Sequence, residues 1–379
     1  MSHPLIDALK TQQTMMLSAL EALVCYESPS REKAALDALA DRITAVFAPF
    51  GARPERIPNE FGGDHLHFRI GQDGDETPPA LIIGHFDTVW PIGTTARLPF
   101  RVEGGRAYGP GAFDMKASLV LAEYALWVCD KLKKRFPRPV ELLFTSDEEI
   151  GSPTSRGLIE SLARRAAYVL VLEPPLPDGR LKTGRKGVGS FTMEITGRAA
   201  HAGSEPEKGV SAVVELAHQI LAITALGDPP AGTTLSVGIV QGGTAGNVVP
   251  AAATALIDAR ALSASETQRI ESALANLTPV LPGATVVVRG GFNRPPMERT
   301  PAVAGLYEKV RAIGRELGLE LGEGSTGGGS DANFTAALGI PTLDGLGAIG
   351  AGAHADEEHI VVEKLPERAA LLAALLLEL

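Results

Sequence analysis

The stretches ALIIGHFDTV at residues 80–89 and VELLFTSDEE at residues 140–149 decide the fold of this chain. Each begins with an apolar run of strand length and ends in polar residues. A third segment, 168–173, has the same form and ends in a glutamate. Because an apolar helical segment, 117–132, lies between the first two, this order predicts a mostly parallel sheet covered by helices on both faces. Ligands of such sheets bind at the carboxyl ends of the strands, where the polar tips lie.

The flanking segments are expected to form helices that cover this sheet. Residues 4–25 have leucines near helical spacing, and Ser30 is expected to cap a second helix with Leu36 and Phe47 on its buried face. The later part of this domain is predicted to contain helix 302–317, the Gly-rich loop 322–329, helix 331–338, strand 341–345 and helix 363–379.

The middle of the chain has a different order of elements. Strand-helix-strand occurs twice, which is typical of a small ferredoxin-like domain. The expected elements are strand 189–196, helix 210–226, strands 234–241 and 253–261, helix 265–277 and strand 285–289. We therefore predict an α/β domain of residues 1–186 and 293–379, interrupted by an inserted α+β domain at 187–292.

Composition excludes several classes of protein. The 379 residues include 35 basic and 45 acidic ones, a net charge of −10, which disfavours binding to nucleic acid. No apolar run reaches the roughly 18 residues of a membrane span, and residues 1–16 lack the pattern of a signal peptide. The two cysteines form no CxxC motif, which argues against a disulfide framework. These features predict a cytoplasmic protein that binds neither nucleic acid nor membranes.

Histidines and carboxylates recur in loops that follow the predicted strands. Carboxylates that cluster without nearby Lys or Arg need cations to offset their repulsion. Two imidazoles with three carboxylates suit a pair of divalent ions, most naturally zinc, with cobalt and manganese as alternatives. The candidate residues are His85, Asp87, Asp114, Glu148, Glu149, Glu173 and His354.

Eight motifs occur in order along the chain: GHFDTV, GPGAFDMK, TSDEEIGS, VLEP, ITGRAAHAG, GNVVPA, TGGGSDAN and GAHADEEHI. This set resembles the M20 family of dizinc metallopeptidases and amidohydrolases. The resemblance is greatest to the carboxypeptidase G2-like branch of glutamate carboxypeptidases, through TGGGSDAN and LGAIGAGAHADEEHI. It covers essentially the whole chain.

The resemblance implies roles for the metal-binding candidates. His85 and Glu173 would bind one zinc ion, Glu149 and His354 would bind the other, and Asp114 would bridge the two.

Two further roles also follow from the resemblance. Asp87 would hydrogen-bond the ring of His85 and fix its tautomer. Glu148 would act as the general base on a water molecule and then donate the proton to the leaving amine. Spacing alone does not decide which of Glu148 and Glu149 is the base.

The family also suggests residues that bind substrate. His201 would stabilise the oxyanion, in its own active site or in that of a partner subunit. Asn247 and Arg260 would contact the substrate carbonyl and carboxylate, and Gly328 and Gly329 would offer backbone N–H groups to an anion. A surface ion pair is the alternative interpretation of Arg260.

The predicted activity is hydrolysis of an amide next to a free carboxylate, in a small molecule or short peptide. An N-acyl-amino-acid deacylase of the acetylornithine deacetylase or desuccinylase type is the alternative, and a non-catalytic metal- or peptide-binding protein is a remote one. Glutamate-specific relatives carry an Arg where this chain has Gly291, which leaves the recognised side chain open. A homodimer is expected through the inserted domain, because its sheet would expose an edge strand.

Overall fold

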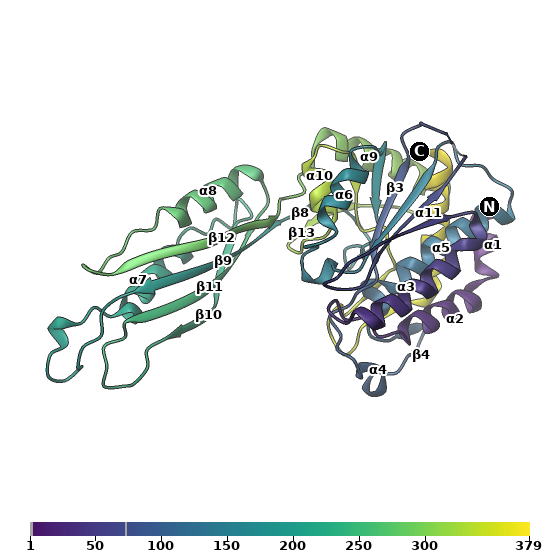
Figure 1. Cartoon of the computed structure of the whole chain (residues 1–379). Helices are drawn as coiled ribbons and strands as arrows, with labels where there is room; N and C mark the ends of the chain where they lie inside the picture. The colour runs from purple at the N-terminus through teal and green to yellow at the C-terminus, as the bar shows by residue number, and fades with distance from the viewer. Residues whose placement is uncertain (1–2, 73) are drawn as a thin grey trace. The chain divides into compact units, whose positions relative to one another are not determined.

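The computed structural model describes residues 3–72 and 74–379. It divides into two compact units, and Figure 1 labels many of the elements of each. The main unit comprises Met1–Thr183, Arg299–Thr326 and Ser330–Leu379. The inserted unit comprises Gly184–Glu298 and Gly327–Gly329.

A six-stranded mixed sheet forms the centre of the main unit. Its strands, in spatial order, are β1 (Arg53–Ile57), β2 (His65–Ile70), β6 (Val140–Thr145), β3 (Ala80–His85), β7 (Tyr168–Val171) and β14 (Thr342–Leu343). The three predicted apolar strands β3, β6 and β7 are parallel neighbours, and β14 pairs parallel with β7. β1 pairs antiparallel with β2, and β2 pairs antiparallel with β6, so the sheet as a whole is mixed.

Helices bury both faces of this sheet. All six residues of β3 and of β6 are buried, which requires cover on both sides. The helices of the main unit are α1 (Pro4–Lys10), α2 (Gln13–Val24), α3 (Lys33–Phe47), α4 (Thr94–Arg97), α5 (Ala117–Lys131), α6 (Arg156–Ala163), α9 (Pro301–Glu316), α10 (Ala332–Ala337) and α11 (Leu365–Glu378). Among the described residues, no helix has the length and apolar content needed to cross a membrane.

Two local predictions for the N-terminal helices are wrong. The segment 4–25 is not one helix, because α1 ends at Lys10 and the Thr11 hydroxyl donates to the carbonyl of Ala8 at 2.7 Å. Ser30 does not cap α3, whose N-cap is Glu32. The Ser30 hydroxyl instead donates to Asp87 Oδ2 at 2.7 Å, so a serine that fits a helix cap supports the site below.

The inserted unit has the predicted ferredoxin-like order. Its elements are β9 (Gly187–Thr196), α7 (Ala212–Thr224), β10 (Thr234–Gly242), β11 (Ala252–Ala261), α8 (Ala264–Ala275) and β12 (Thr285–Arg294). The four strands pair antiparallel in the order β10-β11-β9-β12. Met193, Ile257, Leu216 and Ile270 share one apolar cluster, which places both helices on one face of the sheet and leaves the other face open.

Short strands that the sequence pattern did not predict shape the loops of the main unit. A second sheet contains β15 (Gly350–Ala351), β16 (His359–Val361), β5 (Arg106–Tyr108) and β4 (Arg101–Glu103). β8 (Leu181–Arg185) pairs with β13 (Glu323–Thr326). Because β16 pairs with β5, the loop before β16 lies beside the loop that follows β5.

Candidate metal centre

The metal-binding candidates lie at the carboxyl edge of the central sheet, as the strand pattern predicts. His85 is the last residue of β3, and Glu148 and Glu149 begin a short 3-10 turn after β6. Glu173 follows β7 by two residues, and Asp114 lies in the segment before α5. His354 comes from the loop between β15 and β16.

Asp114 lies between the two histidines. Its Oδ1 atom is 3.2 Å from His85 Nε2, and its Oδ2 atom is 3.5 Å from His354 Nε2. His85 Nε2 is also 3.6 Å from Glu173 Oε1, and His354 Nε2 is 3.3 Å from Glu149 Oε2. One carboxylate therefore faces two separate histidine–glutamate pairs, which is the arrangement that a bridging ligand of two ions requires.

Side-chain donors of this cluster fall into two groups that could each hold an ion. Donor atoms of His85, Glu148 and Glu173 lie within 4.8 Å of one another, and so do those of His85, Asp114 and Glu149. The Oε1 atom of Glu149 is buried without a hydrogen-bond partner. A buried carboxylate oxygen is expensive to leave unpaired, so this atom and the oxygen- and nitrogen-rich donor set both fit divalent cations.

Charges within the cluster shift the pKa values of its members. Hydrogen bonds to Asp114 and Glu149 raise the pKa of His354 to about 10. Burial would lower the pKa of His85, but its hydrogen bonds to Asp114 and Asp87 outweigh burial and raise it. Burial would raise the pKa of Asp114, yet the two histidines hold it well below its usual range. The cluster therefore favours bound positive charge, either as protons on the histidines or as metal ions.

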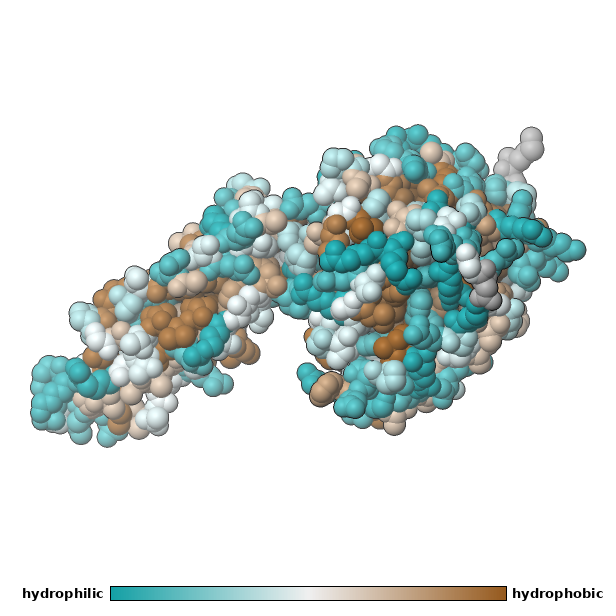
Figure 2. Space-filling model, turned by 45° about the horizontal axis from the view of Figure 1, so that its top comes forward, coloured by the Kyte–Doolittle hydropathy of each residue, from teal (hydrophilic) through white to brown (hydrophobic). Residues whose placement is uncertain are grey.

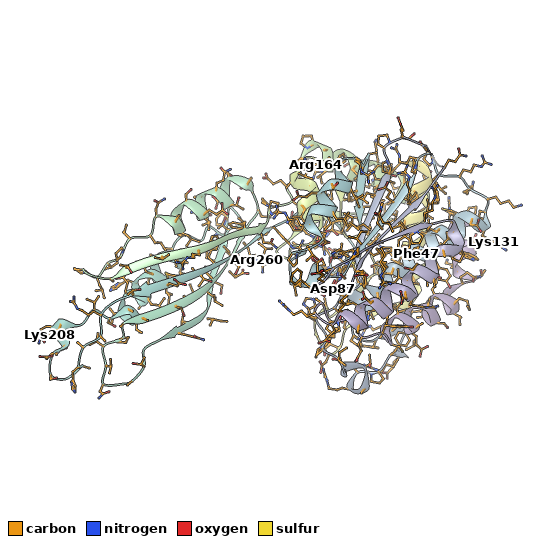
Figure 3. The ribbon with its side chains drawn as sticks, in the orientation of Figure 1. Phe47, Asp87, Lys131, Arg164, Lys208 and Arg260 are labelled. Carbon is orange, nitrogen blue, oxygen red and sulfur yellow. The ribbon has the colours of Figure 1, made fainter. Side chains whose placement is uncertain are left out.

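The backbone and the side chain of Asp87 both lie beside the ring of His85. His85 Nδ1 lies 3.0 Å from the backbone carbonyl of Asp87 and 3.4 Å from its carboxylate. The carboxylate also accepts hydrogen bonds from the backbone N–H groups of Glu148 and Glu149, each at 3.2 Å. The fully buried Asp87, labelled in Figure 3, therefore orients both the histidine and the pair of glutamates.

Glu358 is a supporting residue that the sequence analysis missed. Its Oε1 accepts from the backbone N–H groups of Phe113 and Asp114 at 2.9 and 3.0 Å. Its Oε2 accepts from the backbone N–H of Gly111 at 2.9 Å and from Trp90 Nε1 at 2.8 Å. Four hydrogen bonds to one buried carboxylate fix the loop that carries Asp114. Glu357, next to it in the sequence, is exposed, and no motif distinguishes the two.

Buried aspartates also fix the loop that carries Glu148 and Glu149. Asp331 Oδ1 accepts from the Ser152 hydroxyl at 2.5 Å. Asp147 Oδ2 accepts from both the backbone N–H and the hydroxyl of Thr154, at 2.7 and 2.6 Å. Asp331 belongs to TGGGSDAN, so the sequence marked the motif but not the role of this residue.

The backbone around Glu173 is held by the C-terminal helix. Arg368 of α11 is buried and donates to the carbonyls of Gly345 and Gly347 at 2.6 and 2.8 Å. Gly347 N–H in turn donates to the carbonyl of Glu173 at 2.9 Å. A Cβ at Gly347 would lie 2.2 Å from the Leu172 carbonyl oxygen, so only glycine permits this approach.

Two of the predicted substrate residues meet within the inserted unit. The backbone N–H of Ala202 donates to the carbonyl of Asn247 at 3.0 Å, and His201 forms a β-bridge with Val248. His201 Nδ1 accepts from the backbone N–H groups of Gly203 and Ser204, each at 3.1 Å. A neutral His201 ring therefore carries its hydrogen on Nε2, which makes Nε2 a donor.

The other substrate candidates of the inserted unit have protein partners. Arg260 on β11, labelled in Figure 3, donates from Nε and Nη2 to Asp258, each at 2.8 Å. The alternative interpretation, a surface ion pair, is thus present, and the Nη1 edge lies outside these bonds. The carbonyls of Gly328 and Gly329 accept from Arg185 Nη1 at 3.1 and 2.9 Å. Whether their N–H groups bind an anion stays a prediction.

Comparisons with known proteins agree with the motif order. The sequence pattern of Peptidase family M20/M25/M40 matches residues 81–378. Carboxypeptidase G2 of Pseudomonas sp. (strain RS-16) is 32% identical over 385 residues, covering 99% of this chain and 92% of that protein. Succinyl-diaminopimelate desuccinylase of Gluconacetobacter diazotrophicus is 31% identical, covering 90% of this chain and 89% of that protein.

A solved structure supports the fold over nearly the same length. Aminopeptidase PepT from Bacillus cereus ATCC 10987 superposes with a TM-score of 0.79 at 24% sequence identity. The superposition covers 96% of this chain and 98% of that chain. The family pattern spans well over half of the sequence, and its matched range includes all of the metal-binding candidates. The chain therefore belongs to Peptidase family M20/M25/M40 and is a metal-dependent amide hydrolase of that family.

Proposed function

We propose that the protein holds two zinc ions and hydrolyses an amide bond next to a free carboxylate, as a carboxypeptidase does. His85 and Glu173 bind one ion, Glu149 and His354 bind the other, and Asp114 bridges them. The observation that carries this proposal is the position of Asp114, whose two oxygens face different histidines. The ions would polarise the substrate carbonyl and lower the pKa of water.

Glu148 is the proposed general base. Its backbone N–H donates to Asp87 Oδ1, and its carboxylate lies near His85 and Glu173, at the centre where the attacking water would bind. It takes a proton from the attacking water and donates it to the amine as the C–N bond breaks. Glu149 is the proposed metal ligand of the pair, because its carboxylate faces His354.

Residues of the inserted unit are proposed to bind the substrate. His201 Nε2, whose hydrogen is fixed by the two backbone donors at Nδ1, supplies a hydrogen bond to the oxyanion. Asn247 lies beside it and contacts the carbonyl, while the Nη1 edge of Arg260 takes the carboxylate. Gly328 and Gly329 offer backbone N–H groups to the same carboxylate.

The test of this proposal is the variant Glu148→Gln. We expect it to bind the same amount of zinc as wild type and to lose turnover by roughly 10²–10⁴-fold, the usual contribution of a general base. The matched variant Glu149→Gln removes a metal ligand, so it should lose zinc as well as activity. Wild-type turnover by Glu148→Gln would overturn the assigned chemistry.

Deacylation of N-acyl-amino acids uses the same centre, and one of the relatives described above is named as a desuccinylase. A substrate panel separates the two activities. Short peptides and N-acyl-amino acids with the same C-terminal residue are compared by kcat/KM. A clear preference for peptides supports the carboxypeptidase, and a preference for acetyl or succinyl groups supports the deacylase.

We further propose a homodimer formed through the inserted unit. β10 is an edge strand, and Ile239 and Val240 on it are each 53% exposed. α7 packs over β10 and exposes Leu221 by 71%. Figure 2 shows hydrophobic residues on the surface of this unit. A second copy of the chain that pairs with β10 would extend the sheet and bury these exposed apolar side chains. Sedimentation would detect the dimer. The predicted cytoplasmic location belongs to the same proposal.

A further inference from the structure

The turn that follows β6 has a strained backbone conformation next to the two glutamates of the metal centre. Glu148–Ile150 form its 3-10 part, and Gly151 ends that part with a φ of 91°, as glycines at the ends of helical turns commonly do. Ser152 follows with a φ of 57°. A residue with a side chain is disfavoured in this left-handed region, because its Cβ comes too close to the following carbonyl oxygen. Contacts outside the turn must therefore hold Ser152 in this conformation.

A buried aspartate from a distant segment makes these contacts. Ser152 is fully buried, and its hydroxyl donates to Asp331 Oδ1 at 2.5 Å. The other oxygen of this carboxylate, Oδ2, accepts from the hydroxyl of Thr145 at 3.3 Å. Thr145 is the last residue of β6 and comes before the turn. One carboxylate therefore binds the segment that carries Glu148 and Glu149 at both of its ends.

The backbone on either side of Asp331 is itself held by buried polar residues. The backbone N–H of Ser330 donates to Asn333 Oδ1, and the hydroxyl of Ser330 donates to Asp344 Oδ2, each at 2.8 Å. All three of these residues are fully buried, and Asp331 is buried with them. The carboxylate of Asp331 is therefore a fixed anchor for the turn.

Backbone hydrogen bonds inside the turn connect this anchor to the glutamates. The N–H of Ser152 donates to the carbonyl of Asp147, and the N–H of Gly151 donates to the carbonyl of Glu148, each at 2.8 Å. A change in the φ of Ser152 would break this pattern of bonds. It would therefore move the backbone of Glu148, and with it the Glu148 carboxylate.

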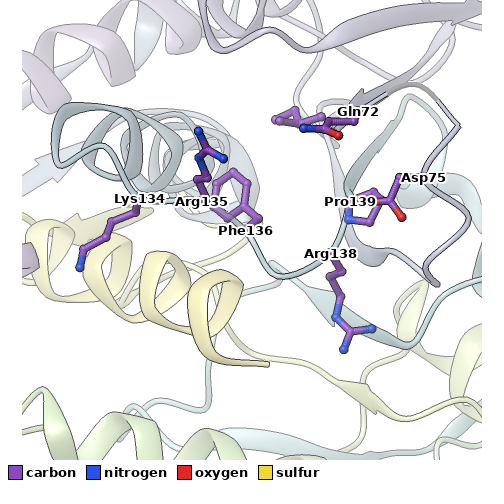
Figure 4. A pocket seen from close by; sticks show the side chains of 9 residues that line it. Gln72, Asp75, Lys134, Arg135, Phe136, Arg138 and Pro139 are labelled. Carbon is purple, nitrogen blue, oxygen red and sulfur yellow. The ribbon is translucent and has the colours of Figure 1, made fainter.

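A cavity elsewhere in the main unit lies away from this turn. It has a volume of about 530 Å³ and is lined by Lys134, Arg135 and Arg138, whose charged groups point in different directions in Figure 4. Ile70, which also lines it, pairs with Val140 at the start of β6, whereas the turn follows the end of this strand. The cavity therefore lies at the opposite edge of the sheet and takes no part in placing the glutamates.

We infer that Ser152 and Asp331 are positioning residues for Glu148, the proposed general base. The inference rests on the proposed function, which gives Glu148 its part in the reaction. The bond between Ser152 and Asp331 holds the turn in the left-handed conformation that brings the Glu148 carboxylate to the metal centre. Without this bond the turn relaxes, and a displacement of a reacting group by about 1 Å can cost roughly 10²-fold in rate.

The test is the variant Ser152→Gly in the full zinc-loaded chain. Glycine adopts a positive φ without strain, so the variant should fold, but it has no hydroxyl for Asp331. With a peptide that wild type cleaves, we expect kcat to fall by about 10–100-fold, while KM and the zinc content at saturating zinc stay unchanged. Thr233→Val is the control, because the buried Thr233 of the inserted unit donates to Glu266 Oε2 at 2.5 Å. This control loses the same kind of bond away from the turn and should keep the wild-type kcat.

A double-variant cycle shows whether the loss acts through Glu148. In a Glu148→Gln background, Ser152→Gly should lower kcat no further, because the base that Ser152 positions is already absent. A general loosening of the structure would lower kcat by the same factor in both backgrounds, and that result overturns the inference.

Two other results overturn the inference and leave the proposed function intact. One is a wild-type kcat for Ser152→Gly, and the other is a loss of kcat no larger than that of Thr233→Val. Wild-type turnover by Glu148→Gln overturns the proposed function, and the inference with it.

Discussion

Replacing Glu358 by glutamine tests whether this buried side chain builds the metal centre. In the folded protein each carboxylate oxygen accepts two N–H donors, one pair from Phe113 and Asp114 and the other from Gly111 and Trp90. Glutamine has the same shape but only one oxygen. Its NH₂ group must therefore face one of the two donor pairs, whichever way the amide is turned.

The size of the effect follows from those contacts. Two N–H groups lose their acceptor in Glu358→Gln, and each unsatisfied buried donor costs about 1–3 kcal/mol. The free energy of unfolding should fall by about 2–6 kcal/mol, which is a large share of the stability of most domains. Asp114 also loses the anchor of its backbone when the NH₂ group faces its side, so the affinity for zinc should fall.

Urea unfolding of the zinc-free protein measures the first effect, and zinc titration measures the second. Glu357→Gln is the matched control, because Glu357 is the adjacent glutamate and is exposed. We expect the control to differ from wild type by less than about 0.5 kcal/mol, as surface substitutions generally do. If Glu358→Gln is as stable as the control and binds zinc equally well, the carboxylate does not hold the loop and the reasoning is refuted.

Two further predictions concern pH and metal removal. Burial raises the pKa of Glu123 to about 7, with Arg42 as an opposing charge. The native state therefore keeps this proton until pH 7, and stability is lost as the pH rises from about 4.5 through 7. Glu123→Gln should be more stable than wild type by about 1–3 kcal/mol at pH 8 and equal to it at pH 4, and thermal melts at both pH values measure this. A chelator should abolish hydrolysis and lower the melting temperature, since an ion at 100 times its Kd stabilises the native state by about 2.7 kcal/mol. Unchanged melting after chelation, with zinc shown to be removed, would contradict the assigned site.

Hydrophobic patterning predicted most of the fold because burial determines it directly. β6 has the predicted bounds of Val140 and Thr145, and the βαββαβ order of the inserted unit was readable from alternating apolar residues. The hydrophobic patterns did not predict the strands whose formation does not depend on burial. β15 and β16 have two and three residues, and β16 pairs with β5, which lies about 250 residues earlier in the chain. No local signal in a sequence reports a contact over that distance.

The residues around the centre were harder to predict than the centre itself. His85, Glu149 and Glu173 follow apolar strands, and that position marks them. Ser30 and Glu358 have no such mark, because each acts through hydrogen bonds to segments far away in the sequence. Ser30 was assigned to a helix cap, since a serine before a helix fits both roles until its partner is known.

The two Glu-Glu pairs of this chain show why geometry must decide between neighbours. In Glu148-Glu149 both side chains lie near the centre, and the contact of Glu149 with His354 distinguishes the proposed ligand from the proposed base. In Glu357-Glu358 the difference is burial: one side chain is solvated, and the other accepts four hydrogen bonds behind Asp114. Because both members of each pair are glutamates, composition, charge and motif cannot distinguish them. Chemical type therefore selects the candidates, while the local turn of the backbone assigns their roles.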